Sequence, residues 1–258
     1  MEDIGFTDPC VIFALGRESQ AFRREFPPTQ RFPGAPCWAR FCGPAWLSIL
    51  VMETGVGATR TERALKWLFD KPQLGVVPYR PQLVISAGFA GSLHAERRVG
   101  DIILANEVVD ADGGSWRTTW PEEFPEGEWQ PPLHRGRLLT IGQIVATPDE
   151  KKLLAEKHGA VAVDMESAIV ARWCADRSVP FACVRSISDD FGTPLSPSLA
   201  GLLRDGRVDA LRLVGSVLIR PWIIGELWRL ARQTTYAAEQ LGKALGELLT
   251  LTTPYGEE

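Results

Sequence analysis

The chain has 258 residues, of which 45% are hydrophobic, and this length and composition can bury a large α/β core. The formal charge is −4 and the pI is near 5.6, and no block of Lys or Arg supplies the basic face of a nucleic-acid-binding protein. The N-terminus is acidic, and no run of about 18 apolar residues occurs. We therefore expect a cytoplasmic protein with no membrane span and no nucleic-acid partner.

Short apolar runs, separated by Gly, Pro and acids, predict strands that are buried by helices on both faces. Pro148 fits the first turn of a helix, where proline is tolerated. Residues 87–93, AGFAGSL, are expected to form a glycine-rich turn. The expected strands cover residues 10–15, 46–52, 83–86, 101–105, 143–146, 160–163 and 181–187, and the expected helices cover residues 59–69 and 148–158.

This order of elements predicts one α/β domain over residues 1–258, a three-layer α/β/α fold with a mixed central sheet. Residues 206–250 are expected to add a helical extension, with one amphipathic helix on each side of Pro221. Residues 113–132 are dense in Pro, Gly and Glu and lack an apolar period, which predicts a long surface loop. Simple disorder is one interpretation of this loop. A lid over a site is the other, because the aromatic residues of the loop are costly to leave in water.

The five cysteines and three histidines indicate neither a disulfide framework nor a metal site. The cysteines are odd in number and form no CxxC pair, and the histidines share no ligand spacing. We expect reduced core thiols, no metal and no cofactor.

Acidic residues follow two of the predicted strands. Asp164 and Glu166 follow one strand, and Asp189 and Asp190 follow another, at the edge where open α/β sheets bind ligands. Asp164 is interpreted as a helix N-cap and Asp190 as a turn former, and a turn former is also the alternative for Asp189. Glu18 follows the first strand and would lie at the same edge, although an exposed acid at a helix start is the alternative.

Five segments carry a family resemblance in their order and spacing. Together they resemble the purine nucleoside phosphorylase and methylthioadenosine/S-adenosylhomocysteine nucleosidase superfamily over residues 11–192. The segments are ALGRE, ETGVG, SAGFAGSLHAERRVGDIIL, VDMESAIVA and VPFACVRSISD.

The resemblance implies cleavage of the N-glycosidic bond of a purine nucleoside, a 5′-substituted adenosine, through a cationic transition state. It implies that Asp189 donates a proton toward N7 of the leaving purine and that Glu18 activates water. Glu166 would accept a hydrogen bond from the ribose 2′-hydroxyl, and Met165 would pack against the sugar unless it is a plain core residue. Arg185 would orient the acids near it.

The remaining binding residues are assigned by the same resemblance. Gly91 matches a tight glycine turn that lets the backbone approach the substrate. The phosphorylase branch holds phosphate with an Arg and a Ser near this turn, whereas this chain has Ser86 and Phe89, which favours water as the nucleophile. Phe89 also changes the shape of the pocket. Val145 lies in QIVATPDEK, which replaces the purine-stacking segment of the nucleosidases and contains no Phe.

QIVATPDEKKLLAEKHGAVAVDMES and the C-terminal helices also resemble the hopanoid-associated phosphorylases, which remove adenine from an adenosylated lipid. Phosphorolysis of such a lipid is therefore one alternative function, and a catalytically weak nucleoside-binding protein is another. A peripheral membrane contact through residues 222–250 is a further hypothesis, and packing on the core or on a partner subunit of a homo-oligomer is its alternative. The residues that suggest the contact, or a channel to a large 5′ substituent, are Trp222, Ile223, Ile224, Leu227 and Trp228.

Overall fold

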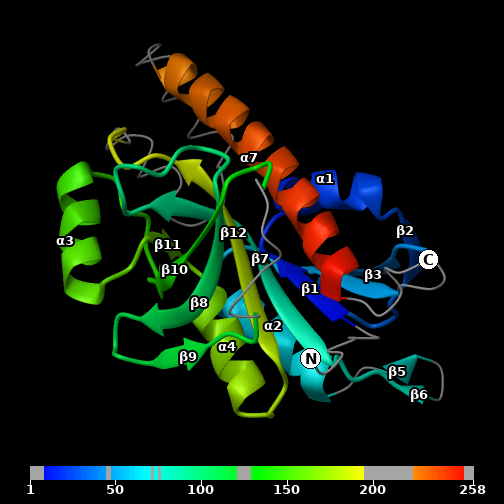
Figure 1. Ribbon diagram of the computed structural model, residues 1–258. Coiled ribbons are helices and arrows are strands. Elements are labelled where there is room, and N and C mark those ends of the chain that lie inside the picture. The colour runs from blue at the N-terminus through cyan, green and yellow to red at the C-terminus, as the bar shows by residue number, and fades with distance from the viewer. Residues whose placement is uncertain are drawn as a thin grey trace.

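The computed structural model describes residues 9–44, 48–70, 73–74, 77–120, 129–194 and 223–252. Figure 1 shows a twisted central sheet with helices packed on it. In chain order the elements are β1 (Pro9–Phe13), α1 (Gly16–Glu25), β2 (Pro28–Arg31), β3 (Trp38–Cys42), β4 (Ile49–Glu53), α2 (Ala58–Asp70), β5 (Gln73–Leu74), β6 (Val77–Pro78), β7 (Leu83–Ser92), β8 (Ile102–Asp110), β9 (Ser115–Arg117), β10 (Leu133–Thr140), α3 (Pro148–His158), β11 (Ala162–Asp164), α4 (Ser167–Ala175), β12 (Phe181–Asp189) and α7 (Ile223–Thr252).

The main sheet has ten strands in the order β11-β10-β8-β12-β7-β1-β4-β3-β2, and β9 pairs with β8. The sheet is mixed, since β7 is parallel to β1 and β12 but antiparallel to β11. Because β11 pairs with both β10 and β7, the strands β7, β12, β8, β10 and β11 form a closed circuit. The carboxyl ends of β7 and β12 therefore lie beside the β11–α4 junction.

Two apolar clusters lie on opposite faces of the sheet. Along β1, Cys10 and Ile12 belong to the cluster that includes side chains of α2 and α4, whereas Val11 and Phe13 belong to the cluster that includes side chains of α1 and α7. This alternation is the period of two of a strand that is buried on both faces. Figure 1 shows the same arrangement, with α1 and α7 on one side and α2 and α4 on the other. The expected three-layer α/β/α fold with a mixed sheet is confirmed.

Several expected elements are present with shifted ends. The helix at residues 148–158 is confirmed as α3, with Thr147 and Glu150 forming its capping box. The helix at residues 59–69 is α2, which is one residue longer at each end. The first strand ends at Phe13 rather than at residue 15, because Leu15 is the N-cap of α1.

The expected glycine-rich turn at residues 87–93 is wrong. Strand β7 continues through these residues to Ser92, pairing along β12 and then with β11. Gly88 and Gly91 stand inside this strand and are not among the glycines with positive φ. Their role in the fold is therefore close packing rather than chain reversal.

Other strand assignments also fail. Residues 143–146 form no strand, since the Ala146 N–H donates to the Glu150 carboxylate at the start of α3. Strand β10 was not predicted, and neither were β2, β3, β5, β6 and β9. All four residues of β2 are exposed, so no buried apolar face marks this strand in the sequence.

The surface loop expected at residues 113–132 is partly ordered against the sheet. Strand β9 pairs with β8, and the indole of Trp120 is buried and donates a hydrogen bond to the Cys183 carbonyl at 3.2 Å. Residues 121–128 lie outside the described part, and so does Phe124.

The second of the two C-terminal helices is confirmed as α7, which packs along α1, whereas the first falls on residues outside the described part. No helix among the described residues is long and apolar enough to cross a bilayer.

Candidate active site

Glu18 lies in the first turn of α1 with its side chain turned into the protein. It is 5% exposed, which excludes the interpretation as an exposed helix-start acid. Its carboxylate accepts three backbone N–H bonds, from Ala14 at 2.9 Å, Leu15 at 2.8 Å and Phe89 at 3.0 Å. Burial raises the pKa of Glu18, and these N–H donors and the charge of Arg185 oppose the rise. A carboxylate with about four acceptor positions keeps one for a further donor such as water.

Glu166 lies where β11 passes into α4, at the N-cap position of that helix. Its Oε1 accepts the Gly57 N–H from the β4–α2 loop at 2.8 Å. Burial raises the pKa of Glu166 to about 7, and the negative charges of Asp164 and Glu18 add to the rise. A carboxyl group with this pKa gains and loses its proton near neutral pH.

Arg185 and Asp164 form a buried ion pair, with side chains that are 3% and 2% exposed. Arg185 Nη2 donates to Asp164 Oδ2 at 2.7 Å, to Ser167 Oγ at 2.7 Å and to Ser86 Oγ at 2.8 Å. Asp164 also accepts the Ser167 N–H and the Thr140 hydroxyl, so it stabilises the start of α4 although the N-cap position itself is Glu166. Arg185 was predicted to orient the acids near it, and the acid that its guanidinium contacts is Asp164.

Several of the predicted residues line one narrow cavity of about 10 Å³, which has room for about one water molecule. Glu18, Phe89, Glu166 and Arg185 all line it. Thr54 and Ser86 contribute hydroxyl groups to the same wall. Strands β7 and β12, the start of α1 and the start of α4 therefore converge on a polar space with two carboxyl groups.

The other predicted residues lie outside that cavity lining. Met165 is partly buried beside Glu166. Val145 is 8% exposed and belongs to a separate apolar cluster with Leu139 and Val163. The structure thus gives Val145 a packing environment.

Asp189 lies at the end of β12, and its Oδ2 is 2.6 Å from Nζ of Lys151 on α3. Asp189 Oδ1 accepts a longer bond from Ser188 Oγ at 3.3 Å. Asp190 behaves as the turn former that was expected, since its Oδ1 accepts the Thr193 N–H at 2.9 Å. Sequence reasoning missed Lys151, because the pair Lys151–Lys152 has the pattern of a solvated helix face.

Two glycines of β7 make room for these acids. A Cβ at Gly91 would lie 3.0 Å from Asp189 Oδ2, and a Cβ at Gly88 would lie 2.8 Å from Glu18 Oε1. Gly91 was predicted to form a tight turn that lets the backbone approach the substrate, but it lies within a strand, and the group that approaches it is the Asp189 carboxylate. Gly91 is three positions after Gly88, which is about 10 Å along the strand at about 3.3 Å per residue.

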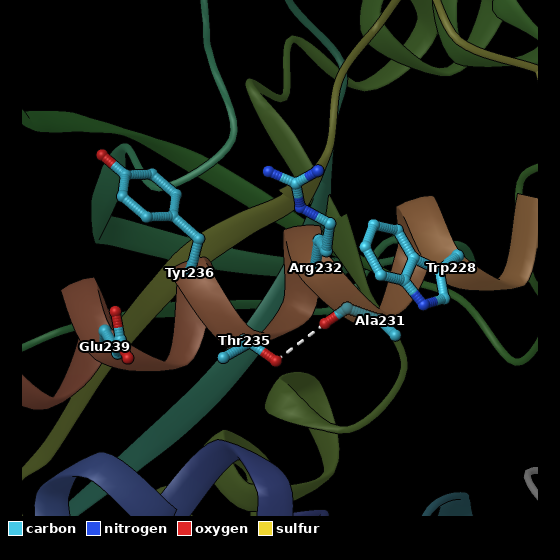
Figure 2. Close-up of a pocket in the computed structure, with 6 residues that line it drawn as sticks. All are labelled: Trp228, Ala231, Arg232, Thr235, Tyr236 and Glu239. Atoms are coloured by element: carbon cyan, nitrogen blue, oxygen red, sulfur yellow. Dashed lines mark hydrogen bonds between the residues drawn. The ribbon is translucent and has the colours of Figure 1, made fainter. Parts of the chain in front are cut away.

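A second, open hollow lies along one face of α7 and is lined by Trp228, Arg232 and Tyr236 (Figure 2). Trp228 is 66% exposed, and the Arg232 guanidinium lies 5.4 Å from the centre of its ring. Tyr236 packs over Gly100. Of the residues that suggested a membrane contact, Trp222 lies outside the described part, and no side chain is described for Ile223, Ile224 or Leu227.

Within the described ranges, no group of three or more His, Cys, Asp or Glu side chains is arranged to hold a metal ion. The described cysteines are free thiols, and four of the five are buried.

Comparison with known proteins places these features in a family. The chain is 23% identical over 233 residues to the 5′-methylthioadenosine/S-adenosylhomocysteine nucleosidase of Bacillus thuringiensis subsp. konkukian, covering 81% of this chain and 97% of the relative. It is 24% identical over 200 residues to the enzyme of the same name from Exiguobacterium sp., covering 67% and 81%.

Solved structures share the fold. The Helicobacter pylori 5′-methylthioadenosine/S-adenosylhomocysteine nucleosidase with butyl-thio-DADMe-Immucillin-A has a TM-score of 0.68 at 18% identity, covering 95% of this chain and 98% of that chain. Helicobacter pylori futalosine hydrolase has a TM-score of 0.67 at 16% identity, covering 95% and 97%. The model of the phosphorylase superfamily matches residues 10–126 and 122–204, and the chain belongs to that superfamily.

Proposed function

We propose that this protein hydrolyses the N-glycosidic bond of a 5′-substituted adenosine and releases adenine. The observation that carries the proposal is the cavity in which Glu18, held by three backbone N–H groups, and Glu166, with a pKa of about 7, face the same polar space. The names of the relatives support a 5′-substituted adenosine as the substrate class.

In the proposed reaction, Glu18 uses its remaining acceptor position to hold water and takes a proton from it as the water attacks the anomeric carbon. Glu166 in its ionised form accepts the ribose 2′-hydroxyl and stabilises the positive charge that develops on the sugar. Asp189 gives a proton to the leaving base. The roughly 10 Å between Gly88 and Gly91 along β7 separates the group that acts on water from the group that acts on the base.

Water is favoured over phosphate because of the charge on the cavity wall. Arg185 is the cation among the described residues that line the cavity, and its guanidinium is already bonded to Asp164, Ser86 and Ser167. A phosphate dianion beside Glu18 and Glu166 would meet two carboxyl groups without a free cation.

The test is incubation of the purified chain with a panel of 5′-substituted adenosines, with and without phosphate, while free adenine is measured. Adenine release that does not depend on phosphate is expected, and it should be lost in Glu18→Gln. Release only with phosphate would support phosphorolysis instead. Tight nucleoside binding without release from any substrate would contradict the proposal and favour a binding protein.

We also propose a homo-oligomer. Large apolar side chains on two helices support it, since Leu153 of α3 is 64% exposed and Trp228 and Tyr236 of α7 are 66% and 50% exposed. Light scattering after size exclusion tests this, with a monomer at micromolar concentration as the contradicting result.

A further inference from the structure

Helix α3 buries the charged side chain of Lys151 and exposes the apolar side chain of Leu153. The Lys151 side chain is 2% exposed, whereas Lys152 is 68% exposed and Leu153 is 64% exposed. Burial of an ammonium group costs several kcal/mol unless close partners offset that cost. A buried lysine and an exposed leucine on the same helix indicate that α3 is oriented so that Lys151 points into the protein.

The helix itself does not require the lysine. Lys151 lies in the first turn of α3, where the helix dipole disfavours a positive charge. The Thr147–Glu150 capping box already satisfies the start of the helix, since Glu150 accepts from the N–H groups of Ala146 and Thr147. The partners of the ammonium group must therefore explain its position.

Both partners are at the end of β12. Nζ of Lys151 donates to Asp189 Oδ2 at 2.6 Å and to the Asp190 carbonyl at 2.6 Å. These bonds fix the carboxylate and the backbone of the next residue, just after the register of β12 against β7 shifts between Ile187 and Asp189. Asp189 Oδ1 is left with the longer Ser188 contact and lies against Gly91.

We infer that Lys151 is a positioning residue that holds Asp189 by Oδ2 and stabilises the negative charge that this carboxyl acquires as the base departs. The inference rests on the proposed function. In that step the C–N bond breaks with its electron pair going to the base, and the proton on Asp189 Oδ1 passes to N7, since Oδ2 accepts from Lys151. The water held by Glu18 forms the new bond to the anomeric carbon, and solvent returns a proton to Asp189 after the products leave. The carboxylate that results lies 2.6 Å from a cation already in place, so no reorganisation is needed.

The experiment compares Lys151→Met and Lys151→Arg with the wild type, and Lys152→Met is the matched surface control. In Lys151→Met, kcat for adenine release should fall about 100-fold while KM stays within about twofold, because the lost interaction acts in the transition state. Lys151→Arg should recover part of this loss, and Lys152→Met should behave as the wild type. Melting temperatures of all four proteins identify any loss of folding.

A second substrate separates a chemical role from a structural one. A riboside with the same 5′ group and a 4-nitrophenolate leaving group departs as an anion without a proton, so Lys151→Met should cleave it at nearly the wild-type rate. Unchanged kcat in Lys151→Met, a loss confined to KM, or equal losses in Lys151→Met and Lys151→Arg that follow the melting temperature would overturn the inference alone. A wild type that releases no adenine would overturn the proposed function and this inference with it.

Discussion

Two acidic centres lie about three residues apart along β7, and they hold their carboxyl groups by different means. At the cavity, Glu18 and Glu166 are held mainly by backbone N–H groups, three on Glu18 and that of Gly57 on Glu166. At the end of β12, Asp189 is held by the side chain of Lys151 from another helix. The first centre keeps carboxyl groups whose pKa values are raised by burial, and Glu18 there accepts the proton of water. The second centre places a full positive charge beside the carboxyl group that donates a proton.

The largest effect is expected from a substitution at the first centre, the Glu18–Glu166 cavity. Glu18→Gln should lower kcat by about 10²- to 10⁴-fold, the usual contribution of a positioned acid or base, because an amide cannot take the proton of water. Steady-state kinetics of adenine release checks this. The control is Glu156→Gln on α3, whose side chain is 65% exposed. Activity within tenfold of the wild type in Glu18→Gln would remove Glu18 from the mechanism.

The ion pair behind the cavity is expected to matter for folding. Asp164→Ala leaves the Arg185 guanidinium buried without its carboxylate and should lower the free energy of unfolding by about 3–5 kcal/mol. Urea denaturation measures it. The matched control is Glu62→Ala, which removes the half-exposed Arg172–Glu62 pair and should cost at most about 1 kcal/mol. Equal costs for the two variants would contradict a structural role for the buried pair.

Gly91→Ala tests the second centre without removing a charge. The added Cβ would lie 3.0 Å from Asp189 Oδ2 and must displace the carboxylate, so kcat should fall by about 10- to 100-fold with the fold retained. Gly142→Ala is the control, because a Cβ there meets nothing within 4 Å. Wild-type kinetics in Gly91→Ala would show that the position of Asp189 is unimportant.

The pH dependence of activity sharpens the difference between the centres. Glu166 must be ionised to accept the 2′-hydroxyl, and its pKa is about 7, so kcat should fall about tenfold for each pH unit below that value. A profile of kcat from pH 5 to 9 measures this limb. A flat profile down to pH 5 would contradict the assignment.

The raised pKa of Glu166 also makes the stability of the fold fall as the pH rises. The folded chain binds the Glu166 proton more tightly than the unfolded chain, whose pKa is near 4.5. The stabilising contribution is therefore complete below about pH 4.5 and is lost as the pH rises through about 7. Glu166→Gln should lose less stability than the wild type between pH 5 and pH 8.

Much of the first centre could be predicted from the sequence, because acids after buried strands gather at one edge of an α/β sheet. Glu18, Glu166, Phe89 and Arg185 were predicted, and all four line one cavity. These residues could be assigned because the segments around them, and the order of those segments in the chain, resemble a known family. Asp164 and Asp190 also make the local bonds that their positions suggested.

The second centre could not be predicted in full, because it depends on how α3 is rotated against the sheet. A lysine beside another lysine is usually solvated, and nothing local distinguishes buried Lys151 from exposed Lys152. The glycines of residues 87–93 were mistaken for a turn because a strand and a turn both use glycine. Only the pairing with β12 and the nearby carboxylates show that these glycines make space.

The central claim is that water, activated in the Glu18–Glu166 cavity, cleaves the glycosidic bond. Cleavage of a 5′-substituted adenosine in ¹⁸O-labelled water without phosphate, followed by mass spectrometry of the sugar, tests it most directly. We predict adenine and a free sugar that carries one ¹⁸O at the anomeric carbon, formed at a rate that added phosphate does not change. A sugar 1-phosphate formed only with phosphate, or no cleavage at all, would contradict the claim.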